Sequence, residues 1–527
     1  MRSNVVSIVL HGLKVGEGAR HLLTIERNSV TPLYEQIYQY LKSRIEHGQY
    51  AAGSRLPSVR SLAGEVGVSK ITVEQAYLQL AAEGYIKAHD RSPYEVLPLP
   101  ILLDNGAHFE KDYDVDNSYD GNESAAAVDN SSGETITELD TRGMLKNGPY
   151  EVPIRPTNQD ELPANGTQAI PIRYNFATGA MDPEGFDYTR WKRYIGYILR
   201  EPERLLAYGH PQGEPELRAE LAKYLNNARA VRTTVDHIII GSGTQAMVMM
   251  LAALLKRAGL TTVAVDASVI IGVTHIFNDY GFTVITVDQH SETLLKDLRK
   301  AGVEALYCTP SHGDRQGRVM SVGRRKELLH WAAEQNSYLI EDDYDSELRY
   351  YGRPISSLQG MATTERVIYL GTPSKVLPPS IRISYMVLPP VLWRDFLTYR
   401  TSYRQSAGVM EQLVWARYIK DGEWSKQIRR LRKHYADKSK VLAAQLQQTF
   451  GDTVKVYLPE GGVYIGLTIF TDKGADALLQ KAREAGCDVR IEADGDDEVR
   501  CLLSFSAIPT NELEAAVKEL GNAWKGM

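Results

Sequence analysis

The sequence has little cysteine, no excess of basic residues and no uninterrupted hydrophobic run. Its three cysteines, Cys308, Cys487 and Cys501, are an odd number without the spacing of metal ligands. A disulfide framework or a cysteine metal site is therefore not expected, and a reducing cytoplasm is the predicted setting. The most apolar stretch, 238–255, is broken by Gly241–Gln245, so it predicts a strand, a turn and a helix and no membrane span.

The net charge of −6 excludes a chain that is basic throughout. Contact with nucleic acid must then come from a local patch. The hydrophobic content of 43% and the charged content of 24% are ordinary for a soluble globular protein. A chain of 527 residues is too long for one hydrophobic core, so two or more domains are expected.

Four regions follow one another along the chain. Residues 1–30 form an N-terminal extension whose role the sequence leaves open, and residues 31–96 are patterned as helices with a short hairpin. Residues 97–172 are polar, with 11 acidic residues against one base between positions 104 and 140. That composition cannot build a packed core, which predicts an acidic flexible linker. Residues 173–527 alternate helical and β-rich runs.

The alternation in 173–527 predicts a mostly parallel β-sheet that is covered by helices. Helical segments are expected at Thr244–Ala258 and Val322–Gln335. The expected strands are His237–Ile240, Thr262–Val265, Thr283–Thr286, Ala305–Tyr307, Tyr338–Ile340 and Val367–Leu370.

Residues 31–96 have the outline of a helix-turn-helix. Apolar residues recur at helical spacing from Leu33 to Ile45 and predict a first amphipathic helix. Ser58 and Ser69 are placed to cap a second and a third helix, and Gly67 between them permits a tight turn. In a helix-turn-helix the first residues of the last helix face base edges in the major groove.

That placement makes the start of the third helix a candidate DNA reader, formed by Ser69, Lys70, Ile71 and Thr72. The segment 84–96 predicts a two-stranded wing with Arg91 at its tip. A generic three-helix domain is the alternative, because residues 31–96 balance seven acids against seven lysines and arginines.

Three blocks in this region resemble the winged helix of the GntR superfamily. They are Leu56-Pro-Ser-Val-Arg-Ser-Leu-Ala63, Val68-Ser-Lys-Ile-Thr-Val73 and the run from Ala76 to Tyr85. The resemblance implies binding to a double-stranded DNA operator, and it places four residues at DNA-contacting positions, namely Arg55, Arg60, Lys70 and Thr72. Lys70 stands where arginine is usual, which weakens any bidentate reading of guanine. Pro93 stands where the wing usually has glycine.

A second set of residues offers what pyridoxal 5'-phosphate needs from a protein. The needs are a lysine for a Schiff base, a carboxylate for the pyridine nitrogen, a donor for the ring hydroxyl and a cradle for the phosphate. Lys375 follows a β-rich run and the segment Gly371–Ser374. Asp342 and Tyr344 stand where a predicted strand ends, at the edge where open α/β sheets bind ligands. We expect Asp342 to face the pyridine nitrogen and Tyr344 the ring hydroxyl.

The phosphate cradle also has candidates. Arg382 follows Lys375 by seven residues and is a suitable anchor, while Thr372 and Ser374 offer hydroxyls. Gly243 lies in a turn between a strand and a helix, and the backbone amides at that helix N-terminus would bind a dianion. Each element has an ordinary alternative: a solvated surface pair, a loop or helix cap, or a plain glycine turn. Their order and spacing on an alternating β/α chain favour the cofactor.

The chain as a whole resembles the MocR/GabR group, in which a GntR winged helix is fused to a fold-type I aminotransferase domain. The blocks that carry this resemblance are Tyr208–Arg218, Cys308–His312, Ile340–Glu347, Gly371–Arg382 and Ile428–Tyr435. The implied fold class is α/β: a winged helix-turn-helix plus a large PLP-dependent transferase domain with a mostly parallel sheet and a smaller C-terminal α/β subdomain.

The resemblance also implies a head-to-tail homodimer and further cofactor contacts. Tyr208 matches a tyrosine that reaches the phosphate of the neighbouring subunit. Thr244 and Gln245 match phosphate contacts, and His312 falls near the ring hydroxyl. These positions complete the expected cofactor site.

The departures from the family concern the ligand more than the cofactor. The segment 265–272 lacks the aromatic residue that usually stacks on the pyridine ring, which leaves Ile270 or its neighbour to give aliphatic packing. Residues 313–316 also differ from the usual run. The candidates for the ligand carboxylate are Arg500 as the nearest match, Arg490 as the second, and Arg315 as a substitute.

Three functions are compatible with these observations. The first is a PLP-dependent transcriptional regulator, in which a small amine or amino acid displaces Lys375 by aldimine exchange and shifts the dimer between two arrangements. The alternative is an active aminotransferase with a fused DNA-binding domain, although the missing aromatic counts against efficient turnover. A degenerate fold that binds no cofactor is disfavoured, because Lys375, Asp342, Tyr344 and Arg382 are all retained.

Overall fold

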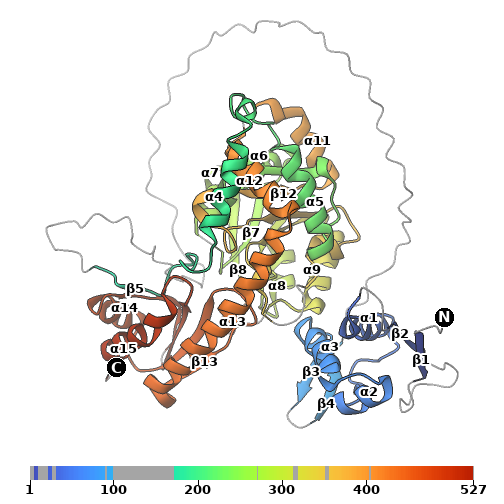
Figure 1. Ribbon diagram of the computed structural model, residues 1–527, viewed down its shortest axis with the longest axis vertical. Coiled ribbons are helices and arrows are strands. Elements are labelled where there is room, and N and C mark those ends of the chain that lie inside the picture. The colour runs from blue at the N-terminus through green and yellow to red at the C-terminus, as the bar shows by residue number, and fades with distance from the viewer. Residues whose placement is uncertain are drawn as a thin grey trace, which may run out of the picture. The chain divides into compact units, whose positions relative to one another are not determined.

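The computed structural model describes residues 5–9, 22–26, 31–89, 92–98, 171–269, 271–312, 319–350, 355–402, 405–495 and 497–525. Most of the expected linker 97–172 lies outside the described residues. Arg91, Ile270 and residues 313–316, which include Arg315, also lie outside them. Within the expected N-terminal extension, strand β1 (Val5–Val9) pairs antiparallel with β2 (Leu22–Glu26). Figure 1 labels the elements.

Residues 31–98 form three helices and a hairpin, drawn in blue in Figure 1. The elements are α1 (Leu33–Glu46), α2 (Val59–Val66), α3 (Lys70–Ala82), β3 (Ile86–His89) and β4 (Ser92–Val96). The predicted caps are confirmed: Ser58 accepts the Ser61 N–H and Ser69 accepts the Thr72 N–H, both at 3.1 Å. Gly67 ends α2 with φ 67°, a left-handed conformation that lets the N-cap of α3, Ser69, follow two residues later.

The three helices bury the apolar residues that recur along them. One core joins Ile37 and Leu41 of α1, Leu62 and Val66 of α2, and Val73, Tyr77 and Leu80 of α3. Ile86 and Val96, which face each other across the hairpin, belong to the same core. Helical spacing in the sequence therefore corresponds to shared burial.

The larger region is built on a seven-stranded sheet in the order β6-β12-β11-β10-β9-β7-β8. Its strands are β6 (Ile238–Gly241), β7 (Thr262–Asp266), β8 (Thr283–Val287), β9 (Ala305–Cys308), β10 (Tyr338–Asp343), β11 (Val367–Gly371) and β12 (Ser384–Val387). Only β12 runs antiparallel to its neighbours, so the predicted mostly parallel sheet is confirmed. The prediction lacked β12, which is four residues long and wholly buried and so shows no alternation.

Helices pack on both faces of this sheet. Successive residues of β12 show the division, because Tyr385 belongs to one buried core and Met386 to another. The helices of this region are α4 (Tyr188–Ile198), α5 (Pro215–Arg229), α6 (Thr244–Arg257), α7 (Ile271–Asp279), α8 (Leu294–Lys300), α9 (Val322–Glu334), α10 (Leu358–Met361), α11 (Pro390–Tyr399) and α12 (Val409–Lys420).

A smaller C-terminal α/β subdomain follows the long helix α13 (Glu423–Phe450), which runs toward it in Figure 1. Its antiparallel sheet has the order β13-β14-β17-β16, and α14 and α15 accompany it. The bounds are β13 (Val454–Tyr457), β14 (Tyr464–Phe470), α14 (Ala475–Glu484), β16 (Arg490–Asp494), β17 (Glu498–Ser504) and α15 (Leu513–Ala523). A short parallel pair joins β5 (Tyr174–Asn175) to β15 (Cys487–Asp488).

No helix within the described ranges has the length and apolar character needed to cross a lipid bilayer.

Candidate functional site

The end of β10 carries a buried carboxylate, Asp342, in the middle of the large sheet. Tyr307 of β9 donates a hydrogen bond to Asp342 Oδ2 at 2.7 Å. The other oxygen, Oδ1, is buried and has no hydrogen-bond partner among the described residues. Burial raises the Asp342 pKa to about 7; the hydrogen bond from Tyr307 lowers it, and the nearby charges of Asp343 and Asp345 raise it further. A protonated ring nitrogen is the kind of donor that this unpaired oxygen lacks.

Lys375 lies four residues beyond the end of β11, and its ammonium group reaches the segment that precedes α4. Nζ donates a hydrogen bond to the Gly179 carbonyl at 2.8 Å. Burial lowers the Lys375 pKa, Asp345 opposes this shift, and Arg490 adds to it. A lowered pKa favours the neutral amine, the form that attacks an aldehyde. A Cβ at Gly179 would lie 2.4 Å from Lys375 Nζ and 2.6 Å from the Tyr464 hydroxyl, so a larger residue there would displace these two groups.

Tyr344 and His312 lie side by side, with ring centroids 5.0 Å apart. His312 Nδ1 lies 2.7 Å from Asp345 Oδ2, a contact that orients the imidazole. Burial holds the Tyr344 pKa well above its ordinary value, so its hydroxyl stays protonated and can donate a hydrogen bond. The predicted ring-hydroxyl donors therefore lie together, and Asp345 links them electrostatically to Lys375.

The predicted phosphate cradle surrounds one pocket, with a volume of about 290 Å³. The predicted residues that line it are Gly243, Thr244, Gln245, Thr372, Ser374 and Arg382. Arg382 Nη2 donates to the Ser242 carbonyl at 3.4 Å. Gly243 has φ 102°, and a Cβ there would lie 2.4 Å from Arg382 Nη2, so glycine is needed for the guanidinium to come this close. A helix N-terminus beside a guanidinium is suited to a phosphate dianion.

The three candidate arginines for a ligand carboxylate are placed differently. Arg490 of β16 lies close enough to Lys375 and Tyr344 to affect their pKa values, and it pairs with Glu492. Arg500 of β17 is exposed and pairs with Glu498. Arg490 lies opposite Leu502, two residues along β17 from Arg500, so the two arginines share a face of the sheet and differ in their position along it. Arg315 lies outside the described residues.

The candidate DNA-reading residues lie on the surface of the winged helix. Arg55, Arg60, Ser69 and Lys70 are exposed. Thr72 is half-buried, and its Oγ1 lies 2.8 Å from Ser69 Oγ. The start of α3 is therefore open to a partner, with Lys70 as the first helical residue.

Tyr208 lies between α4 and α5 with 90% of its surface exposed. Tyr188 at the start of α4 is also exposed, as are Leu199 and Leu206 between α4 and α5.

Comparison with known proteins identifies both regions. Residues 33–96 match the gntR family of bacterial regulatory proteins, and residues 174–518 match aminotransferase class I and II. The chain belongs to the MocR/GabR-type transcriptional regulators. It is 31% identical to the regulator YhdI of Bacillus subtilis, over 95% of this chain and 97% of the relative. It is 28% identical to the probable rhizopine catabolism regulatory protein MocR of Rhizobium meliloti, over 88% of this chain and 87% of that protein.

A solved structure with a similar fold is the kynurenine aminotransferase of Pyrococcus horikoshii. It has 27% sequence identity and a TM-score of 0.58, covering 68% of this chain and 91% of that one. The MocR/GabR-type regulator therefore combines a GntR helix-turn-helix, which implies DNA binding, with a fold-type I aminotransferase domain.

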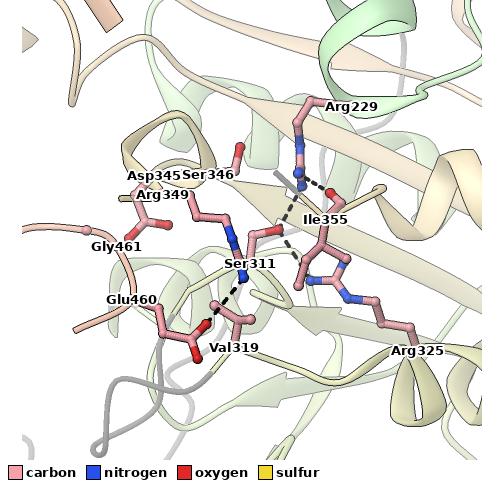
Figure 2. A pocket seen from close by; sticks show the side chains of 11 residues that line it. Arg229, Ser311, Val319, Arg325, Asp345, Ser346, Arg349, Ile355, Glu460 and Gly461 are labelled. Carbon is pink, nitrogen blue, oxygen red and sulfur yellow. Dashed lines mark hydrogen bonds and ion pairs between the residues drawn. The ribbon is translucent and has the colours of Figure 1, made fainter. Parts of the chain in front are cut away.

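Beside Ser311 and Asp345, this MocR/GabR-type regulator has a small cavity of about 20 Å³, enough for one water molecule. Figure 2 shows Arg229 and Arg325 converging on Ser311 there. Arg229 Nη2 donates to Ser311 Oγ at 2.7 Å, and its Nε donates to Asp343 Oδ2 at 2.7 Å. Arg229 thereby ties the end of α5 to β10 and to the residue before His312.

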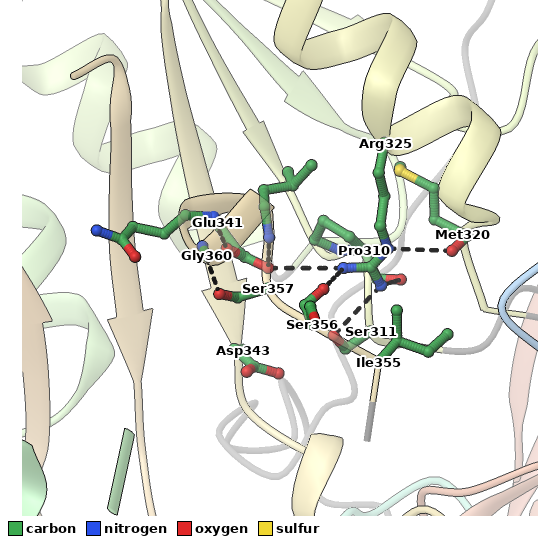
Figure 3. Close-up of polar contacts among 12 residues, drawn as sticks. Pro310, Ser311, Met320, Arg325, Glu341, Asp343, Ile355, Ser356, Ser357 and Gly360 are labelled. Carbon is green, nitrogen blue, oxygen red and sulfur yellow. Dashed lines mark hydrogen bonds and ion pairs between the residues drawn. The ribbon is translucent and has the colours of Figure 1, made fainter. Parts of the chain in front are cut away.

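Arg325 and Glu341 form a second buried pair of the regulator, 3.8 Å apart (Figure 3). Glu341 accepts the Leu358 N–H at 2.9 Å and the Gln359 N–H at 3.1 Å, at the start of α10. Arg325 donates to the Pro310 carbonyl at 2.7 Å. These contacts connect β10 to the start of α10 and to the segment after β9, and so help to position Asp342 and His312.

Sequence reasoning missed four residues of the site region: Gly179, Tyr307, Arg229 and Tyr464. Tyr307 stands in a predicted strand, so pairing that strand with the one before Asp342 would have suggested it. Gly179 lies 196 positions from Lys375 and Arg229 lies 82 positions from Ser311, whereas Tyr464 belongs to β14 of the C-terminal subdomain. No local motif indicates them.

Proposed function

We propose that this regulator is a PLP-dependent DNA-binding protein that senses an amine or amino acid through aldimine exchange at Lys375. The observation that carries the proposal is the arrangement around Lys375: an amine with a lowered pKa, a buried Asp342 with one unpaired oxygen, and a pocket lined by Arg382 and the start of α6. When bound, the cofactor supplies the aldehyde and the electron-withdrawing ring. The protein supplies the remaining contacts.

Each contact has a defined role in the proposal. Lys375 Nζ is the covalent attachment point, and Asp342 Oδ1 accepts from the pyridine nitrogen. Tyr344 and His312 lie on the side of the ring hydroxyl. The phosphate is bound by the amides and hydroxyls of the cradle, with Arg382 as the cation; the cradle residues are Gly243, Thr244, Gln245, Thr372 and Ser374.

Arg490 is the candidate for an effector carboxylate. Its position beside Lys375 and Tyr464 supports this role. Glu492 pairs with its guanidinium and holds it in place. An amino acid whose amine replaces Lys375 at the cofactor would then present its carboxylate to Arg490.

The proposed assembly is a head-to-tail homodimer that acts in the cytoplasm. Exposed Tyr208 supports it, because the residue has the size and hydroxyl needed to reach a phosphate in a neighbouring subunit. An effector that binds the two arrangements of the dimer unequally shifts their populations and thereby the placement of the winged helices on paired operator half-sites.

The test of the cofactor assignment is spectroscopic. Purified protein with added pyridoxal 5'-phosphate is expected to show a visible Schiff-base band that Lys375→Ala lacks. A band that persists unchanged in the variant contradicts the assignment. Screening amines and amino acids for a shift of the band then identifies the effector class, and footprinting with and without the active compound tests the DNA response.

An active aminotransferase is a second candidate function. The lowered pKa of Lys375 favours it, because a released neutral lysine can act as a base. Steady-state turnover with amino donors and keto acids distinguishes the two functions. A sensor completes at most the first half-reaction, whereas an enzyme regenerates its starting form repeatedly.

A further inference from the structure

We propose that Tyr307 is a positioning residue for the cofactor: its hydroxyl fixes Asp342 Oδ2 so that Oδ1 alone is presented to the pyridine nitrogen. The proposal rests on the cofactor assignment made above and adds the residue that orients and ionises its carboxylate. Nothing in the sequence motif around Asp342 includes Tyr307, which comes from the neighbouring strand.

Strand register brings the two residues together. Tyr307 of β9 lies opposite Ile340 of β10, and Asp342 follows Ile340 by two residues. Residues two apart in a strand lie on the same face, so Tyr307 and Asp342 share one face of the sheet. The hydroxyl donates to Oδ2 at 2.7 Å, and the Tyr307 ring is fixed by burial beside Phe277 at a centroid distance of 6.4 Å.

The charges around Asp342 explain why this hydrogen bond matters. Asp343 and Asp345 both disfavour an ionised Asp342, whereas His312 favours it. Tyr307 is the one hydrogen-bond donor to the Asp342 side chain in the part of the chain that the structure describes. A carboxylate that must keep the pyridine nitrogen protonated has to be ionised itself, and Tyr307 favours that form.

The sheet contains a matched pair that serves as a control. Tyr369 of β11 lies opposite Glu341, and Asp343 follows Glu341 by two residues, so this pair repeats the geometry on the other face. Tyr369 donates to Asp343 Oδ2 at 2.5 Å. Asp343 also receives Arg229 Nε at 2.7 Å, so it does not depend on its tyrosine alone.

The experiment compares Tyr307→Phe with Tyr369→Phe in the full-length protein. Each change removes one buried hydroxyl and keeps the ring. Cofactor-free protein is titrated with pyridoxal 5'-phosphate and followed by tryptophan fluorescence and by the visible band. The dissociation constant of Tyr307→Phe is expected to rise about tenfold or more, as for a hydrogen bond to a charged group, whereas that of Tyr369→Phe changes little.

Two further readouts separate positioning from a structural role. Loss of the donor raises the Asp342 pKa, so the fall in cofactor affinity at acid pH should begin at higher pH in Tyr307→Phe than in wild type. In an Asp342→Asn background, Tyr307→Phe should have little further effect on affinity, because its partner is no longer a carboxylate.

The outcomes are distinct. If wild type shows no visible band, the cofactor assignment fails. If wild type shows the band but Tyr307→Phe binds and titrates like Tyr369→Phe, the positioning role is wrong. Should Tyr307→Phe not fold, Tyr307→His, which keeps a ring N–H donor, must bind more tightly than Tyr307→Leu, and equal affinities contradict the proposal.

Discussion

Burial acts in opposite senses on the two ionisable residues at the centre of the site. It lowers the Lys375 pKa, which favours the neutral amine that a Schiff base requires. It raises the Asp342 pKa to about 7, against the ionised form that a pyridinium requires. Asp342 is therefore a residue retained at a cost to the stability of the cofactor-free protein, which is typical of functional sites.

Asp342→Asn is expected to stabilise the cofactor-free protein at alkaline pH. The folded-state pKa lies above the unfolded value, so wild type loses stability as pH rises from about 4 to about 7. Asparagine does not titrate, so the variant gains on the order of 2–4 kcal/mol relative to wild type across that window. Thermal unfolding at about pH 5 and about pH 8 checks this; a difference that does not grow with pH contradicts it.

Arg490 and Arg500 form a matched pair for the effector. Arg490→Gln is expected to weaken the spectral response to carboxylate-bearing effectors by roughly tenfold to a hundredfold, because a charge-assisted hydrogen bond is lost. Simple amines should be unaffected. Arg500→Gln should leave both responses unchanged, since Arg500 is exposed, whereas Arg490 lies close enough to Lys375 to affect its pKa. Titration of the visible band measures each response, and equal effects of the two changes would exclude Arg490 as the specific contact.

These same residues show which parts of the candidate site the sequence could predict. The shared location of Lys375, Asp342 and Tyr344 could be inferred from the sequence because each stands at or shortly after the end of a parallel strand, and such ends meet at one edge of a sheet. The choice between Arg490 and Arg500 could not be inferred, because it depends on how β16 and β17 pair, including the irregularity between Ile491 and Ala493. Arg500 and Leu502 share a face of β17, so the pairing decides which of them lies beside Arg490.

At the scale of elements, α3 has an exposed row of side chains on the face opposite to the one that packs in the core. Ile71, Glu74, Gln75 and Leu78 are exposed and recur at helical spacing, whereas Val73, Tyr77 and Leu80 are buried. Ile71 is 66% exposed directly after Lys70, at the helix start that enters a major groove. An aliphatic side chain there is suited to a thymine methyl group, and Gln75 to adenine.

Ile71 and Lys70 are expected to differ in their effects on DNA binding. Ile71→Ala should relax preference at one base pair by about 1 kcal/mol without changing the salt dependence. Lys70→Ala, if the lysine contacts phosphate, should weaken binding to all sequences and reduce the salt slope by about one. Binding to a randomised operator pool at several salt concentrations measures both. A uniform loss for Ile71→Ala would show that the residue reads no base.

Local signals determined the elements that were predicted correctly. The Ser58 and Ser69 caps, and the glycine turn between them, depend on residues within three positions of one another. Strand β12 was missed because its position depends on pairing with β6 and β11, which lie far apart in the chain. Short buried strands have no period to recognise.

At the scale of the whole molecule, Tyr208 is the residue whose proposed role depends on a second copy of the chain. It is 90% exposed, and it precedes Gly209, where a Cβ would lie 2.8 Å from Val409 of α12. The backbone at this turn is therefore packed against α12, while most of the Tyr208 side chain is open to solvent. This combination suits a residue that acts on a neighbour rather than on its own site.

Mixing two defective variants tests that role. Tyr208→Phe dimers should form the visible band with about tenfold weaker cofactor affinity, because a hydrogen bond to phosphate is lost, and Lys375→Ala dimers should form no band. In a mixed dimer, the intact Lys375 site of one subunit receives the partner subunit's Tyr208. After equal mixing and exchange of subunits, about half of the Lys375 sites belong to such dimers and should bind with wild-type affinity. Differently tagged chains check that the subunits have exchanged. If they have and all sites still bind the cofactor weakly, Tyr208 does not act across the dimer, because the mixed dimer contains every other residue of the site.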